Sequence, residues 1–225
     1  MNREFEAVFF DMDGTLINSE PHWLLAETEL MAEYGHPWTK EDQQYCLGGP
    51  LPKIGKYMWE LSGQSMSPEY FHQELVRRAI ARIIAGTEFM PGASELLHEA
   101  ISEGVLVGLV TASPAPMLEA TLSKFPDETF NIALSGDDVS VTKPSPECYF
   151  LAAKRLNVAI ENCVILEDSL TGVAAAIASG AFVIAIPHLV KVEEGKRVRV
   201  LKSLEGVGLN QIEELYRQSQ TIEVM

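Results

Sequence analysis

Cysteine is scarce in this 225-residue chain, and the placement of its three cysteines excludes two structural roles. Cys46, Cys148 and Cys163 are odd in number, widely spaced and never part of a C-x-x-C pair. A disulfide framework needs paired cysteines, and a structural zinc site needs clustered ligands. We therefore expect buried thiols in a reducing compartment, without disulfides or zinc.

Long apolar runs and an excess of basic residues are missing as well. The longest apolar stretch, around residues 105–110, is far too short to span a bilayer, and residues 1–6 show no signal peptide. Lys and Arg number 17 against 32 Asp and Glu, and the formal net charge of −15 repels nucleic acids and anionic lipid. These absences predict a cytoplasmic protein, a monomer by default, with no nucleic-acid or membrane partner.

What the chain does contain is a globular composition, 47% hydrophobic and 22% charged, in which short apolar runs alternate with helical segments. The predicted strands, rich in β-branched and aromatic residues, cover 7–10, 106–110, 132–134, 164–166 and 182–186. The predicted helices that lie between the later strands cover 92–102, 114–125, 147–156 and 170–179. This alternation predicts an α/β fold with a Rossmann-like parallel sheet flanked by helices.

Residues 18–89 carry helical patterns and no convincing strand. A crossover between two parallel strands does not need so many residues. We therefore predict a small α-helical cap over residues 18–89, inserted into a core formed by residues 1–17 and 90–225.

Polar side chains follow four of the predicted strands at their carboxyl ends, which is where open parallel sheets bind ligands. The set comprises Asp11 and Asp13 after the first strand, Thr111, Ala112 and Ser113 after the second, Lys143 in the loop after the third, and Glu167 and Asp168 after the fourth. We expect these residues to meet at one edge of the sheet.

The carboxylates of this set suit a hard divalent cation. Asp11 and Asp13 stand two residues apart, so both side chains can point to the same side, and Glu167 and Asp168 would repel them without a counter-ion. Magnesium prefers such oxygen ligands and leaves room for a phosphate. An Asp-rich turn that only closes the strand, or a calcium loop, are the alternatives for the Asp11–Asp13 segment.

The remaining polar residues suit a phosphate group. Lys143 would pair with Asp11 and with a phosphate, and the hydroxyl of Thr111 would donate to a phosphate oxygen. The backbone N–H groups of Ala112 and Ser113, at the start of a helix, would assist. Taken singly, the lysine is equally typical of a solvated surface, and Thr111 and Ser113 of helix caps, with Ser113 placed to cap the helix from residue 114.

Four ordered segments resemble the motifs of the haloacid dehalogenase superfamily, in its phosphatase branch, and the match extends over essentially the whole chain. These segments are Phe10-Asp11-Met12-Asp13-Gly14-Thr15-Leu16, Thr111-Ala112-Ser113, Lys143-Pro144, and Glu167-Asp168-Ser169 followed by Gly172. The inserted helical segment is similar to the small cap of that family. The subgroup that the chain most resembles contains β-phosphoglucomutases and sugar-phosphate phosphatases.

The resemblance implies a role for each matching residue. Asp11 attacks phosphorus and becomes an aspartyl phosphate, while Asp13 protonates the leaving oxygen and later takes a proton from water. Thr111 and Lys143 hold the transferring phosphoryl group. By the same resemblance, Mg²⁺ is bound by the Asp11 carboxylate, the backbone carbonyl of Asp13 and Asp168. Glu167 is implied to be either a further ligand or a partner of the ligands.

A phosphatase of small phosphorylated metabolites, with sugar phosphates as the substrate that the resemblance suggests, is the function we expect. A phosphosugar mutase is the nearest alternative, but its usual cap histidine would fall at Trp23, one position beyond His22, and the loop before Lys53 lacks an arginine. A non-catalytic protein that keeps the fold is a second alternative. The cap residues that we consider for substrate contact, although ordinary packing explains them as well, are Tyr45, Leu47, Gly48, Lys53, Tyr57 and Trp59.

Overall fold

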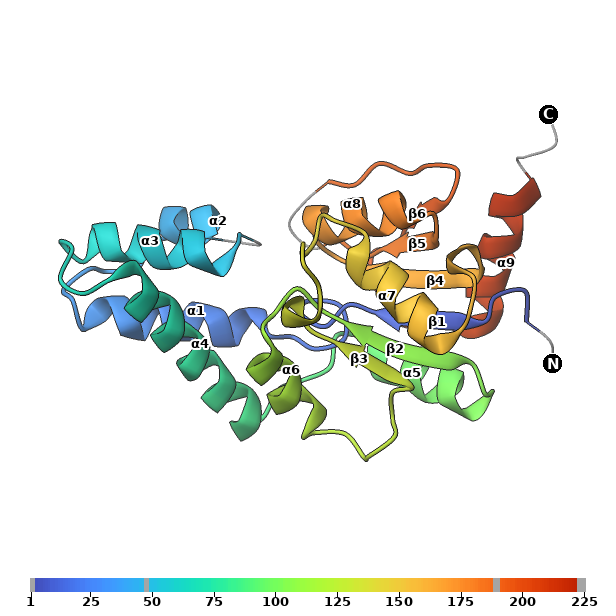
Figure 1. Cartoon of the computed structure of the whole chain (residues 1–225), viewed down its shortest axis with the longest axis horizontal. Coiled ribbons are helices and arrows are strands. Elements are labelled where there is room, and N and C mark those ends of the chain that lie inside the picture. The colour runs from blue at the N-terminus through green and yellow to red at the C-terminus, as the bar shows by residue number, and fades with distance from the viewer. Residues whose placement is uncertain (1–2, 47–48, 188–190, 222–225) are drawn as a thin grey trace. The chain divides into compact units, whose positions relative to one another are not determined.

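Six strands form one sheet in the order β3-β2-β1-β4-β5-β6, and every neighbouring pair is parallel (Figure 1). The computed structural model describes residues 3–46, 49–187 and 191–221. The strands are β1 Ala7–Phe10, β2 Leu106–Val110, β3 Ile132–Leu134, β4 Cys163–Glu167, β5 Phe182–Ala185 and β6 Val198–Val200. The predicted α/β fold with a parallel sheet is therefore confirmed.

The register of the central strands brings their carboxyl ends to the same level. Phe10, the last residue of β1, is paired with Leu109 of β2 and Leu166 of β4. The next residue, Asp11, donates its backbone N–H to the carbonyl of Leu166 at 3.0 Å. The loops that follow β1, β2 and β4 consequently leave the sheet at the same edge.

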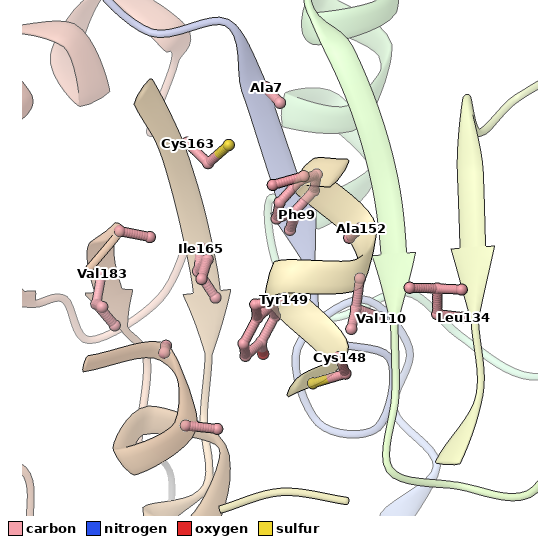
Figure 2. Close-up of a cluster of buried hydrophobic side chains, with 14 of the residues drawn as sticks. Ala7, Phe9, Val110, Leu134, Cys148, Tyr149, Ala152, Cys163, Ile165 and Val183 are labelled. Carbon is pink, nitrogen blue, oxygen red and sulfur yellow. The ribbon is translucent and has the colours of Figure 1, made fainter. Parts of the chain in front are cut away.

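Helices cover both faces of this sheet. Figure 2 shows α7 (Glu147–Leu156) lying over one face, with Cys148 and Tyr149 at the end of the helix nearer the carboxyl ends of the strands. Helix α8 (Leu170–Ser179) packs beside α7, while α5 (Ala93–Ser102) and α9 (Leu209–Thr221) cover the opposite face. Helix α6 (Ala115–Leu122) contacts β3 at the end of the sheet.

The chain divides into two compact units, residues 1–18 with 88–225 and residues 19–87, which we call the core and the cap. Within the core, the two connecting segments run side by side, since the N–H of Asn18 donates to the carbonyl of Glu88 at 2.8 Å and that of Met90 to Leu16 at 3.0 Å. These paired segments anchor both ends of the insertion to the core.

The cap consists of helices around an apolar cluster of its own. Its helices are α1 Glu20–Ala32, α2 Lys40–Cys46, α3 Leu51–Leu61 and α4 Pro68–Ala85. Leu30, Met58, Phe71 and Leu75 are fully buried in its centre. Across the described parts of both units, no helix combines the length and the apolar character that crossing a membrane requires.

Candidate active site

Asp11 and Lys143 form a buried ion pair at the carboxyl edge of the sheet. The Nζ atom of Lys143 lies 2.6 Å from Oδ1 of Asp11, and both side chains are at least nine-tenths buried. The same Nζ donates to Oε1 of Glu167 at 2.7 Å and to the carbonyl of Val110 at 2.9 Å. The structure thus joins Asp11 after β1 and Lys143 after β3 to Glu167, the last residue of β4, and the ammonium group donates to three acceptors.

Glu167 is fully buried, and both of its carboxylate oxygens have donors. Oε1 accepts from Lys143 and, at 2.8 Å, from the hydroxyl of Tyr149 on α7, whereas Oε2 accepts from the N–H of Asp168 and the hydroxyl of Ser169, each at 3.2 Å. A side chain on Gly172 would overlap the carboxylate, so only glycine lets α8 start this close. The sequence pattern missed Tyr149, because its spacing on α7 is that of an ordinary core residue.

Asp168 lies beside the turn that follows β1. Its Oδ1 receives a long hydrogen bond of 3.4 Å from the hydroxyl of Thr15. Gly14 has a left-handed backbone with φ of 81°, and a Cβ atom there would collide with the Asp168 carboxylate. The glycine of the first motif therefore gives Asp168 room to approach Asp11.

The site contains more carboxylate charge than its one lysine neutralises. Burial raises the pKa of Asp11 well above its usual value, Glu167 adds to the rise, and Lys143 opposes it. Burial also raises the pKa of Asp168 to about 7, with further repulsion from Glu167 and Asp13. Burial lowers the pKa of Lys143, but Asp11 and Glu167 outweigh it and raise that pKa well above its usual value, so the ammonium stays charged.

This excess of negative charge fits a divalent cation. One carboxylate oxygen from each of Asp11, Glu167 and Asp168 can be chosen so that all three lie within 4.8 Å of one another. Hard cations prefer such oxygen ligands, and the positive charge would relieve the repulsion that burial intensifies. The acidic cluster is therefore compatible with metal binding, while the donors that surround Glu167 make Asp11 and Asp168 the freer ligands.

The second strand brings Thr111 and Ser113 to Asp13. The hydroxyl of Ser113 donates to Oδ2 of Asp13 at 2.7 Å, and that of Thr111 donates to the same oxygen at 3.3 Å. Our expectation that Ser113 caps the following helix is wrong, because α6 begins at Ala115, and the N–H of that residue is taken by Asp137 at 2.8 Å. Ala112, the other residue predicted for phosphate, lies between the two hydroxyl residues, before the helix starts.

The cap residues considered for substrate contact take part in packing within the cap. The rings of Tyr45 and Tyr57 have centroids 4.3 Å apart, and Nζ of Lys53 lies 4.2 Å from the Tyr45 centroid. The indole of Trp59 donates to the carbonyl of Met66 at 3.0 Å. Two further candidates, Leu47 and Gly48, lie outside the described residues.

Comparison with known proteins finds one family model whose match includes all four sequence motifs. A family model described as haloacid dehalogenase-like hydrolase matches residues 8–186. Hexitol phosphatase B of Escherichia coli strain K12 is 35% identical over 190 residues, which are 82% of this chain and 85% of that protein. A phosphorylated carbohydrates phosphatase of Thermotoga maritima is 32% identical over 180 residues, 78% of this chain and 82% of the other.

Solved structures give the same picture. CbbY from Rhodobacter sphaeroides, in complex with phosphate, superposes with a TM-score of 0.78 at 29% identity and covers 93% of this chain and 99% of its own. A β-phosphoglucomutase from Clostridium difficile superposes with a TM-score of 0.79 over 96% of this chain and 99% of its own. At 21% identity, the second likeness shows the fold alone.

Proposed function

Because the chain belongs to the haloacid dehalogenase-like hydrolases, we propose that it is a Mg²⁺-dependent phosphatase of small phosphorylated carbohydrates, with Asp11 as the nucleophile. The observation that carries this proposal is the ion pair of Asp11 with Lys143, buried beside Asp168 and Asp13 at one edge of the sheet. A carboxylate in this position can attack phosphorus, and the lysine offsets the negative charge that gathers there.

The residues divide the reaction into two balanced steps. Asp11 attacks the phosphorus, the bond from phosphorus to the ester oxygen breaks, and Asp13 gives its proton to that oxygen. The positive charge of Lys143 and the hydroxyl of Thr111 stabilise the phosphoryl group during the transfer. Water then hydrolyses the aspartyl phosphate while Asp13 takes up a proton, which returns both aspartates to their starting state.

Asp11 and Asp168 would hold the metal through their carboxylates, and Asp13 would hold it through its backbone carbonyl. When bound, Mg²⁺ supplies positive charge that keeps Asp11 ionised and polarises the phosphate. Glu167 belongs to the support of the site, because its oxygens already accept hydrogen bonds from Lys143, Tyr149 and the start of α8.

The substrate class rests on the relatives. Two of them, at 35% and 32% identity, are named for hexitol and for phosphorylated carbohydrates. Such substrates leave as alcohols, which are poor leaving groups unless they are protonated, so an acid such as Asp13 is needed. The phosphosugar-mutase alternative remains less suited, since Trp23 stands where the mutases of the subgroup have a histidine.

The test measures phosphate release from a panel of hexitol, hexose and pentose phosphates with and without Mg²⁺. We expect Asp11→Asn to abolish turnover, and Asp13→Asn to lower it by about 100-fold or more, as loss of acid–base catalysis does. Acid quenching followed by peptide mass spectrometry should find the transient phosphate on Asp11. Near-normal turnover by Asp11→Asn would refute the nucleophile, and conversion of β-glucose 1-phosphate to glucose 6-phosphate would establish the mutase.

A further inference from the structure

The two carboxylate oxygens of Asp13 lie in different surroundings. Oδ2 accepts the hydroxyl of Ser113 at 2.7 Å and the hydroxyl of Thr111 at 3.3 Å. Oδ1 is buried and accepts no hydrogen bond from the described residues. A buried oxygen without a donor is costly, so this orientation needs a reason.

The backbone around Ser113 is fixed in a way that aims its hydroxyl. Its N–H donates to Oγ1 of Thr111 at 2.9 Å, and its carbonyl accepts the N–H of Gly136 at 2.8 Å. Because Asp137 supplies the acceptor for the first N–H of α6, the Ser113 side chain is not used as a cap. Its single hydroxyl proton is therefore committed to Asp13.

We propose that Ser113 is a positioning residue, which holds the Asp13 carboxyl group by Oδ2 and thereby fixes the orientation of that group in the site. The inference rests on the proposed acid–base role of Asp13. A short hydrogen bond to one oxygen limits rotation of the whole carboxyl group, so the Ser113 hydroxyl sets the direction in which Asp13 points.

Thr111 and Ser113 then have separate tasks. The contact of Thr111 with Asp13 is the longer of the two, so it is the one that a phosphate oxygen replaces when substrate binds. The shorter contact of Ser113 persists through both steps. Held in this way, Asp13 gives its proton to the departing alcohol oxygen in the first step and takes one from the attacking water in the second.

The test compares two leaving groups in the Mg²⁺-loaded enzyme. p-Nitrophenolate leaves without a proton, whereas the alcohol of the best sugar-phosphate substrate needs one. We expect Ser113→Ala to lower kcat/KM for the sugar phosphate by about 10- to 100-fold and that for p-nitrophenyl phosphate by less than about threefold. Ser113→Thr, which keeps the hydroxyl, should restore most of the loss.

Inhibition by inorganic phosphate separates this role from phosphate binding. Ser113→Ala should leave the inhibition constant within about threefold of wild type, because its hydroxyl is committed to Asp13 and not to phosphate. Equal losses on both esters, or a large rise in that constant, would make Ser113 a phosphate ligand and overturn the inference. Ser123→Ala, which removes an exposed hydroxyl bonded to the carbonyl of Ala120, is the matched control and should change neither.

A second pair of variants shows which claim has failed. Asp13→Ala should show the same dependence on the leaving group, and adding Ser113→Ala to it should cause no further loss. If Asp13→Ala slows both esters equally, the proposed acid role itself is wrong. If Asp13→Ala discriminates and Ser113→Ala does not, only the positioning role of Ser113 is refuted.

Discussion

Glu167 shows how neighbours decide what a carboxylate can do. It lies within reach of Asp11 and Asp168 and so belongs to the acidic cluster. Its oxygens, however, accept hydrogen bonds from Lys143, from Tyr149 and from the backbone and side chain that begin α8. A ligand bond to a metal would have to displace some of these donors, which makes support of Lys143 the function that its contacts favour.

The hydroxyl of Tyr149 should therefore contribute more to stability than an ordinary buried hydroxyl. Tyr149→Phe removes a donor to a buried carboxylate that is paired with Lys143, and we expect the free energy of unfolding to fall by about 1.5–3 kcal/mol. Urea unfolding followed by circular dichroism measures the change. Tyr216→Phe is the control, since that hydroxyl donates at 2.9 Å to the neutral carbonyl of Glu161 and should cost about 1 kcal/mol. Equal losses would contradict the role given to Glu167.

At the scale of elements, five of the six strands could be predicted, whereas the short strand β6 and the helix α2 could not. The strands at 7–10, 106–110 and 132–134 have the predicted bounds, because runs buried on both faces read as continuous apolar segments. Strand β6 was missed, since its three residues include Arg199 and are too short for a pattern. Helix α2 was missed as well, because only Asp42 and Cys46 of its seven residues are buried.

The same limit applies to the candidate site. The rule that ligands bind beyond the carboxyl ends of parallel strands brought Asp11, Lys143 and Asp168 together in the prediction, and their positions in the structure agree with it. The partner of Ser113 could not be read from the sequence. The Ser113 hydroxyl is available to Asp13 because Asp137 accepts the N–H of Ala115 in its place. Asp137 lies 22 residues away along the chain, so sequence spacing assigned this capping role to Ser113.

Within the cap, the carboxyl group of Glu27 on α1 is buried, so its ionisation destabilises the folded state. Burial raises the pKa of Glu27 to about 8, the charge of Glu20 adds to the rise, and the indole N–H of Trp38, at 3.1 Å, opposes it. The folded state therefore binds a proton more tightly than the unfolded state, whose pKa is near the ordinary 4.5. By linkage, this group favours folding below pH 4.5, and that advantage is lost as the pH rises to about 8.

Replacing Glu27 by Gln should remove that pH dependence while keeping an acceptor for Trp38. We expect Glu27→Gln to stabilise the cap relative to wild type by an amount that grows between pH 5 and pH 8 and reaches the order of a few kcal/mol. Urea unfolding at several pH values, followed by tryptophan fluorescence, measures it. The control is Glu60→Gln at a half-exposed position, which should show no such trend. A constant difference at all pH values would show that Glu27 does not titrate in this range.

At the scale of the whole molecule, the predicted family and enzyme class, a haloacid dehalogenase-like phosphoric monoester hydrolase, are confirmed by the relatives. The formal net charge of −15 sets the problem that such an enzyme must solve, because its substrates are anions as well. The core supplies positive charge where the substrate would bind. Lys143 is buried among the carboxylates, and the acidic cluster beside it suits a cation. Binding of a cation should consequently stabilise the core in particular.

Mg²⁺ should raise the stability of one unit and leave the other nearly unchanged. All three tryptophans, Trp23, Trp38 and Trp59, lie in the cap, so their fluorescence follows the unfolding of that unit. At 100 times its dissociation constant, Mg²⁺ should stabilise the core by about 2.7 kcal/mol, which corresponds to roughly 5–10 °C in its melting temperature. Calorimetry should show this shift in a transition that tryptophan fluorescence does not report.

Asp168→Asn is the variant that checks the source of this effect. It removes a carboxylate whose pKa burial raises to about 7, so the core should melt at a higher temperature without Mg²⁺ and should respond little to its addition. If Mg²⁺ shifts the variant and the wild type equally, the ion binds elsewhere on the acidic surface. If the tryptophan signal and the core transition move together, the two units unfold as one, and the stabilisation cannot be assigned to the core alone.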